Sequence, residues 1–214
     1  MKKLNTPFYL TGGTALSRGY FHHRYSDDLD LFISQCSDYG SHVQALFREL
    51  ETCCLSGEFS IDYRRIQKYE HFTQLFLQKE KKDGLVELKI DLINDIAVHY
   101  GGFNEDSLLG TIDSWQNILS NKLAAVFRYE AKDIVDIWVI AKNKIFNWMS
   151  VMEQAKTKEA AVDPVVIFHI LKSFPEHLLE DIKWVIPVDC KLFKQELSQA
   201  ADDILRGNDN SLKK

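Results

Sequence analysis

Alternating apolar and polar positions run through much of the first hundred residues. Five short segments have the apolar content and turn-forming neighbours typical of strands. LysLysAspGly at 81–84 lies between the last two and predicts a hairpin turn. The segments are FYL at 8–10, LDLFI at 29–33, FSIDYRRIQ at 59–67, HFTQLFLQ at 71–78 and LVELKIDLI at 85–93.

Two segments of this half are expected to form helices instead. HVQALFRELETCCL, which ends shortly before Gly57, repeats apolar residues at helical spacing from Val43 to Leu50. ThrGlyGlyThr at 11–14 predicts a tight turn that opens a helix through about Tyr20, with Thr14 as its N-cap. The first half is therefore expected to be a mixed β-sheet with helices packed on it.

The pattern changes after GlyGlyPheAsn at 101–104, and from about Ile112 to Arg206 only helices are expected. Asp163 followed by Pro164 predicts a capped helix start, and Gly207 predicts a helix stop. We expect an α/β (α+β) lobe at 1–111, a helical lobe at 112–214 and a frayed tail from 208. The other helical segments are IDSWQNILSNKLAAVFRYE at 112–130, AKDIVDIWVIAKNKIF at 131–146 and DCKLFKQELSQAADDILR at 189–206.

Composition indicates a globular chain: 45% of the 214 residues are hydrophobic and 27% are charged. No window suits a membrane span and the N-terminus lacks the features of a secretory signal, so we expect a cytoplasmic protein. The four cysteines show no metal or disulfide spacing and are expected to be buried thiols. The net charge of −5 argues against nonspecific coating of nucleic acid.

Three carboxylates lie within apolar strands. Asp28 and Asp30 alternate with leucines, so both should leave the core on one face, and Asp91 should share a face with Lys89. Neighbouring carboxylates repel unless a cation or a proton compensates them. The pattern predicts a site for Mg²⁺ or Mn²⁺, to which Asp91 contributes from a second strand.

The glycine turn suits an anion, because a glycine-rich turn entering a helix offers free backbone N–H groups. Together with the carboxylates it predicts a phosphate cradle beside a metal site. The plainer alternative for the carboxylates is a solvated strand end. An EF-hand fails, because counting from Asp28 places Ile33 where glycine is needed and Tyr39 where glutamate is needed.

Nearby residues have plainer alternatives as well. Arg24 and Ser26 could orient the carboxylates or contact a phosphate, and Arg24 could equally be a structural ion-pair partner. His22 and His23 are expected to form a solvated turn rather than ligate a metal. Lys122 lies in a charged helical segment whose plain interpretation is a solvated face.

Two blocks of sequence resemble the AbiEii/AbiGii-type nucleotidyltransferases, a branch of the polymerase-β-like superfamily. The first is GlyGlyThrAlaLeu at 12–16 followed by Arg24-x-Ser26-x-Asp28-x-Asp30, and the second is NKLAAVFRYEAKDIVDI at 121–137. Position 132 is lysine where this family commonly has arginine. The resemblance implies a nucleotidyltransferase lobe followed by a helical lobe.

The resemblance also implies roles for individual residues. The residues that would bind the nucleotide are Gly12, Gly13, Thr14, Arg24, Ser26 and Lys122. Asp28 and Asp30 would bind Mg²⁺, and Asp91 is our candidate for the third catalytic and metal-binding carboxylate. Asp133 and Asp136 match a later acidic motif.

The expected activity is transfer of a nucleoside monophosphate from an NTP to an acceptor hydroxyl, with release of pyrophosphate. The acceptor could be RNA, including tRNA, a protein or a small molecule, and the resemblance implies a role as a toxin with a cognate antitoxin or in phage defence. One alternative is a catalytically silent nucleotide-binding or protein-interaction module on the same fold. Another is a kinase, which would leave a nucleoside diphosphate.

Overall fold

The computed structural model describes residues 6–213 and divides them into two units. The first contains the described residues up to Ala15 together with Asp27–Ala97 and Phe103–Asp113; the second contains Leu16–Ser26, Val98–Gly102 and Ser114 onward. The main boundary therefore follows residue 113, and two short segments before it group with the helical unit. The first five residues of the expected α/β lobe and Lys214 lie outside the described residues.

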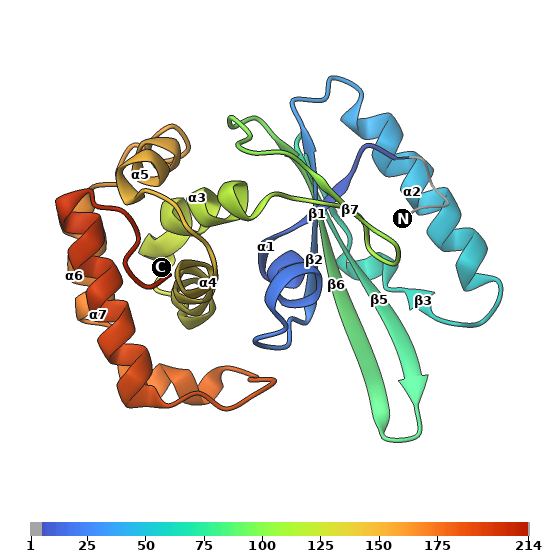
Figure 1. Cartoon of the computed structure of the whole chain (residues 1–214). Coiled ribbons are helices and arrows are strands. Elements are labelled where there is room, and N and C mark those ends of the chain that lie inside the picture. Colours follow the sequence, from blue (N-terminus) through green and yellow to red (C-terminus); the bar gives the residue numbers. More distant parts are fainter. Residues whose placement is uncertain (1–5, 214) are drawn as a thin grey trace. The chain divides into compact units, whose positions relative to one another are not determined.

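The described part of the first unit forms an eight-stranded mixed sheet (Figure 1). Its order is β3-β5-β6-β2-β1-β8-β7, with β4 also paired to β5; β2–β6 and β1–β8 are parallel and the other pairs antiparallel. This confirms the predicted α/β class. The strands are β1 (Tyr9–Thr11), β2 (Asp28–Ser34), β3 (Ser60–Ile61), β4 (Gln67–Lys68), β5 (Phe72–Lys81), β6 (Gly84–Asp95), β7 (Asn104–Asp106) and β8 (Gly110–Ile112).

The predicted strand at 59–67 is wrong as a single element. β3 and β4 are separated by a 3-10 turn at Tyr63–Arg65, because the Asp62 side chain accepts a hydrogen bond from the Arg64 backbone N–H at 3.1 Å and stabilises the turn. β7 and β8 were not predicted, since AsnGluAsp and GlyThrIle contain at most one large apolar residue and show no alternation. The hairpin between β5 and β6 is confirmed: its turn consists of Lys82 and Asp83.

Helix α2 (Tyr39–Cys54) packs on the sheet and fixes which face is buried. The Tyr39 hydroxyl donates to the Leu92 carbonyl at 2.8 Å, and the Tyr39 ring meets Phe8 edge-on. Leu31 and Ile33 of β2 are buried as well. Because side chains alternate along β2, Asp28 and Asp30 lie on the opposite side of the strand from these core residues.

The segment after β1 is helical earlier than predicted. Helix α1 (Gly12–Thr14) continues into a π-helix at Ala15–Phe21, whose wide turn joins the His22 N–H to the Ser17 carbonyl at 2.9 Å. Thr11, not Thr14, is the N-cap residue, because the left-handed φ of Gly12 turns the chain one residue after β1. A π-helix leaves no mark on apolar spacing and was not predicted.

The second unit is helical as predicted. Ser114, Asp163 and Asp189 accept backbone N–H groups at the starts of three helices, and Gly207, with φ of +65°, ends the last. In Figure 1, α6 and α7 lie side by side. The helices are α3 (Trp115–Ala125), α4 (Ala131–Asn143), α5 (Trp148–Lys156), α6 (Pro164–Lys172) and α7 (Cys190–Arg206), with 3-10 turns at Val126–Arg128 and Glu176–Asp181.

Two sequence expectations about the periphery are wrong. The tail is held rather than frayed: Asn210 is buried, and its side-chain amide donates to the carbonyls of Ala141 and Lys144 at 2.6 and 2.8 Å. The cysteines are free but not buried, since Cys53 and Cys190 are exposed and the other two are half-buried.

No helix within residues 6–213 is long and apolar enough to cross a membrane.

Candidate functional site

The glycine turn lies directly against one of the predicted metal ligands. Gly12 has a φ of +66°, in the left-handed region that disfavours a side chain. A Cβ added to Gly12 would collide with the Asp30 Oδ2 atom. Only glycine therefore allows this close approach between the turn and the carboxylate.

Side-chain hydroxyls secure the turn to the strands on either side. The Thr14 hydroxyl donates to the backbone carbonyl of Asp28, and the Thr11 hydroxyl donates to Asp113 Oδ2 at 2.5 Å. Gly13 and Thr14 are both buried. Thr14 thus holds the turn and β2 together, while its predicted contact with a nucleotide stays a prediction.

The sheet register brings two of the three predicted metal ligands side by side. Asp30 pairs with Asp91 on the neighbouring parallel strand, and Asp28 pairs with Lys89. Gln74 of β5, opposite Asp91 in the next ladder, donates to Asp91 Oδ1 at 2.8 Å. Gln74 was not singled out from the sequence, although its place in the alternation of 71–78 puts it on the same face as Asp91.

The Lys89 ammonium lies between two of these carboxylates. Its Nζ is 3.3 Å from Asp28 Oδ2 and 3.1 Å from Asp91 Oδ2. Burial alone would lower the pKa of Lys89, but Asp91 and Asp28 outweigh burial and raise it. Lys89 is therefore a charged ammonium that neutralises part of the carboxylate charge.

The donor atoms suit a hard divalent cation, because all are carboxylate oxygens and the protein already holds a cationic group against two of them. Among residues 6–213, no three His, Cys, Asp or Glu side chains lie close enough together in this structure to hold a metal ion. Lys89, rather than a third carboxylate, lies against Asp28 and Asp91, and metal binding by Asp28, Asp30 and Asp91 stays a prediction.

The second unit contains a separate cluster of buried charges around Asp133 and Asp136 on α4. Both carboxylates are fully buried. Lys122 Nζ is 2.6 Å from Asp133 Oδ1 and 2.9 Å from Asp136 Oδ2. Arg24 donates to both oxygens of Asp136, at 2.8 and 2.7 Å, and Arg128 Nη2 is 2.8 Å from Asp133 Oδ2.

The buried carboxylates and the buried cations of this cluster keep each other charged. Burial would raise the pKa of Asp136, but Lys122, His23 and Arg24 hold it well below its usual value. Burial would lower the pKa of Lys122, but Asp136 and Asp133 raise it. The cluster is therefore a network of charges, and the plain interpretation of Lys122 as a solvated face is wrong.

His23 belongs to the same network and was wrongly placed in a solvated turn. Its Nε2 is 2.9 Å from Asp136 Oδ1 and only 7% of its side chain is exposed, whereas His22 is exposed as expected. His23 Nδ1 is buried and makes no hydrogen bond within the described part of the chain. Apolar spacing could not reveal this contact, because it joins residues more than a hundred positions apart.

Arg24 and Ser26 line a pocket of about 240 Å³ in the second unit. The Arg24 guanidinium is buried against Asp136, which is the ion-pair alternative considered from the sequence. The exposed Arg18 lines the same pocket. Nucleotide binding by Arg24, Ser26 and Lys122 stays a prediction.

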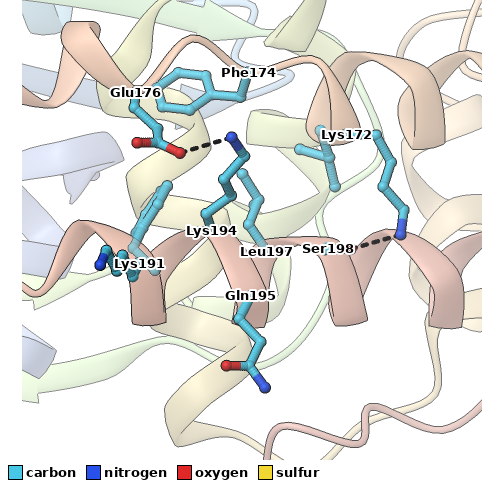
Figure 2. A pocket seen from close by; sticks show the side chains of 10 residues that line it. Lys172, Phe174, Glu176, Lys191, Lys194, Gln195, Leu197 and Ser198 are labelled. Atoms are coloured by element: carbon cyan, nitrogen blue, oxygen red, sulfur yellow. Dashed lines mark hydrogen bonds and ion pairs between the residues drawn. The ribbon is translucent and has the colours of Figure 1, made fainter.

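A groove of about 380 Å³ between α6 and α7 contains none of the predicted site residues (Figure 2). Phe174, Phe193 and Leu197 contribute apolar surface to it. Two of its lysines are engaged within the unit: Lys194 Nζ is 2.6 Å from Glu176 Oε1 and Lys172 Nζ is 2.6 Å from Ser198 Oγ. The groove is thus separate from both charged clusters.

Comparisons with known proteins agree with this fold. The crystal structure of a candidate nucleotidyltransferase from H. pylori has a TM-score of 0.61 at 22% identity, over 95% of this chain and 88% of that chain. JHP933 from Helicobacter pylori has a TM-score of 0.59 at 22% identity, over 95% of this chain and 85% of that chain. At this identity the similarity shows the fold. None of the curated proteins matches the chain.

A family assignment comes from the sequence itself. The family described as nucleotidyl transferase AbiEii toxin, type IV TA system, matches residues 2–211. The match includes the glycine turn, the three carboxylates and the acidic motif on α4. The chain therefore belongs to the AbiEii family of nucleotidyl transferase toxins of type IV toxin–antitoxin systems and is a nucleotidyltransferase.

Proposed function

We propose that this nucleotidyltransferase moves a nucleoside monophosphate from an NTP to an acceptor hydroxyl with release of pyrophosphate. The observation that carries the proposal is the register of β2 and β6, which aligns Asp30 with Asp91 while the Gly12 turn abuts Asp30. A phosphate-binding turn beside aligned carboxylates is the arrangement that phosphoryl chemistry needs.

Asp28, Asp30 and Asp91 are proposed to hold Mg²⁺ or Mn²⁺. The bound cation would supply charge neutralisation at the reacting phosphate and activation of the acceptor hydroxyl. Gln74 fixes the orientation of Asp91 through its hydrogen bond, and Thr14 ties the glycine turn to the backbone of Asp28. Gly12 and Gly13 would present backbone N–H groups to the nucleotide's phosphates.

Lys122 is proposed to contact the nucleotide's phosphates. Its ammonium is held charged by Asp133 and Asp136, and about a tenth of its side chain is exposed. The two aspartates would then act by positioning Lys122 and keeping it protonated. For Arg24 the bidentate contact with Asp136 favours the same kind of positioning role, and Ser26 lines the pocket beside it.

The acceptor is proposed to be RNA, such as tRNA, a protein or a small molecule. The family's association with type IV toxin–antitoxin systems supports action as a toxin and a cognate antitoxin as partner. A cytoplasmic location, where NTPs and these acceptors occur, fits the proposal.

The test is transfer of label from each α-labelled NTP, with Mg²⁺ or Mn²⁺, to RNA and protein fractions of a cell extract. Asp28→Ala should lower transfer at least about a hundredfold, because one ligand of the cation is lost. Asp83→Ala removes an exposed carboxylate in the β5–β6 turn and should leave transfer unchanged.

The product of this experiment separates the alternatives. Label on a macromolecule with release of pyrophosphate supports nucleotidyl transfer and identifies both base and acceptor class. Intact NTP binding with neither label on a macromolecule nor release of pyrophosphate would instead support the catalytically silent binding module. Formation of a nucleoside diphosphate would identify a kinase.

A further inference from the structure

Lys89 is the group in the carboxylate site whose role the nucleotidyl transfer reaction leaves open. It lies on β6 two residues before Asp91, and the β2–β6 register places it opposite Asp28. Both neighbours are therefore fixed by the backbone of the sheet rather than by a chance side-chain conformation. The ammonium lies within 3.3 Å of one oxygen of each.

We propose that Lys89 is the internal counter-ion of Asp28 and Asp91 and competes with a divalent cation for these two carboxylates. This inference rests on the proposed metal site and goes beyond it, because it assigns to Lys89 control of the site's affinity for metal. The free protein would bind a divalent cation weakly until the Lys89 side chain moves away.

Electrostatics indicates that Lys89 competes with a divalent cation for these carboxylates and does not help it to bind. The ammonium occupies carboxylate oxygens that the cation would need, and two cations a few ångströms apart repel each other. Asp91 Oδ1 accepts from Gln74 while Oδ2 faces Lys89. A cation that binds Asp91 through Oδ2 would therefore share this oxygen with the Lys89 ammonium, and the repulsion between the two positive charges favours release of one of them.

The exposure of Lys89 makes displacement feasible. About 30% of its side chain is exposed, and a lysine has a flexible four-carbon stem. The ammonium can therefore leave the carboxylates for solvent without unfolding the strand. Partial exposure also means that a neutral residue at this position is compatible with the fold.

The experiment is titration of the purified full chain with Mn²⁺ alone, with free Mn²⁺ measured by electron paramagnetic resonance. Lys89→Met should bind Mn²⁺ on the order of tenfold more tightly than the unmodified protein, since it removes the competing charge and keeps the side-chain length. Lys89→Arg keeps the charge and should bind Mn²⁺ as weakly as the unmodified protein.

Two further variants control for other effects. Lys82→Met removes an exposed lysine from the turn of the same hairpin and should change the affinity by less than about twofold, because solvent screens its charge. Lys89→Gln carries the same expectation as Lys89→Met and replaces it if thermal unfolding shows that the methionine variant does not fold.

The outcomes separate this inference from the proposed function. Equal or weaker Mn²⁺ binding by folded Lys89→Met, with saturable binding that Asp30→Asn abolishes in the otherwise unmodified protein, would overturn the role of Lys89 and leave the metal site standing. Absence of saturable Mn²⁺ binding in every variant would overturn both.

Discussion

At the scale of single residues, the carboxylate site depends on a few close contacts. Gly12 combines a left-handed backbone with a direct approach to Asp30, and Gln74 and Lys89 divide the two oxygens of Asp91 between them. The alternation of strands predicted which carboxylates share a face. It also placed Lys89 on the face of Asp91, but it could not predict that Lys89 lies opposite Asp28, because that contact depends on the register between β2 and β6, which are distant in sequence.

Gly12→Ala should destabilise the protein and disturb the carboxylate site. A left-handed alanine costs about 1–2 kcal/mol, and its Cβ must additionally push Asp30 away. Urea unfolding should show the loss of stability, and Mn²⁺ titration should show weaker binding.

Gly57→Ala is the matched control for this variant. Gly57 also has a left-handed φ, of +75°, but a Cβ there would meet no atom within 4 Å. Gly57→Ala should lose only the stability that a left-handed alanine costs, and it should bind Mn²⁺ as the original protein does. If the two variants lose the same stability and both retain full Mn²⁺ affinity, the close approach of Gly12 to Asp30 has no functional importance.

At the scale of elements, the sequence predicted most of what has a clear period or cap. The hairpin β5–β6, the Asp163 cap and the Gly207 stop are confirmed. The strand β7 was missed because its sequence, AsnGluAsp, contains no apolar residue. The tail was expected to fray because it is a chain end, but Asn210 completes hydrogen bonds for carbonyls at the end of α4, a contact that the sequence does not reveal.

Asn210→Ala should destabilise the helical unit. Its side-chain amide serves the carbonyls of Ala141 and Lys144, and a buried polar group left without its partner costs about 1–3 kcal/mol. Chemical denaturation followed by circular dichroism would measure the loss. Asn208→Ala, which changes an exposed side chain two residues earlier, should stay within about 0.5 kcal/mol of the original protein. A comparable loss in both variants would mean that the tail is not specifically anchored by Asn210.

At the scale of the whole molecule, charge is concentrated in two places with different solvation. The carboxylates of the first unit are partly exposed, so their repulsion can be relieved by Lys89 or by a metal ion. Asp133 and Asp136 of the second unit are fully buried and depend on protein cations alone. The family resemblance predicted that both motifs matter, but the buried network around Asp136 is visible only in the structure. Its energetic consequence is a dependence of stability on pH.

Asp136→Asn should destabilise the protein strongly near neutral pH and less in acid. Removing one partner of a buried ion pair costs about 3–5 kcal/mol, because Lys122 and Arg24 keep charges that the amide no longer balances. The folded-state pKa of Asp136 lies below that of the unfolded chain. The contribution of Asp136 to the free energy of unfolding is therefore complete above about pH 4. It declines as the pH falls further, by roughly 1 kcal/mol at about pH 3.

Urea unfolding of the original and variant proteins at neutral pH and near pH 3 would measure this difference. The difference in unfolding free energy between the original protein and Asp136→Asn should decrease in acid. In the original protein, the unfolded chain takes up a proton at Asp136 that the folded chain does not. Asp202→Asn is the control, because Asp202 pairs with Lys172 while 44% of its side chain is exposed. An exposed ion pair of this kind contributes at most about 1 kcal/mol. The unfolding free energies of Asp202→Asn and the original protein should therefore differ little at both pH values. A gap for Asp136→Asn that is equally small, or that widens in acid, would show that the buried carboxylate is not held ionised by Lys122 and Arg24.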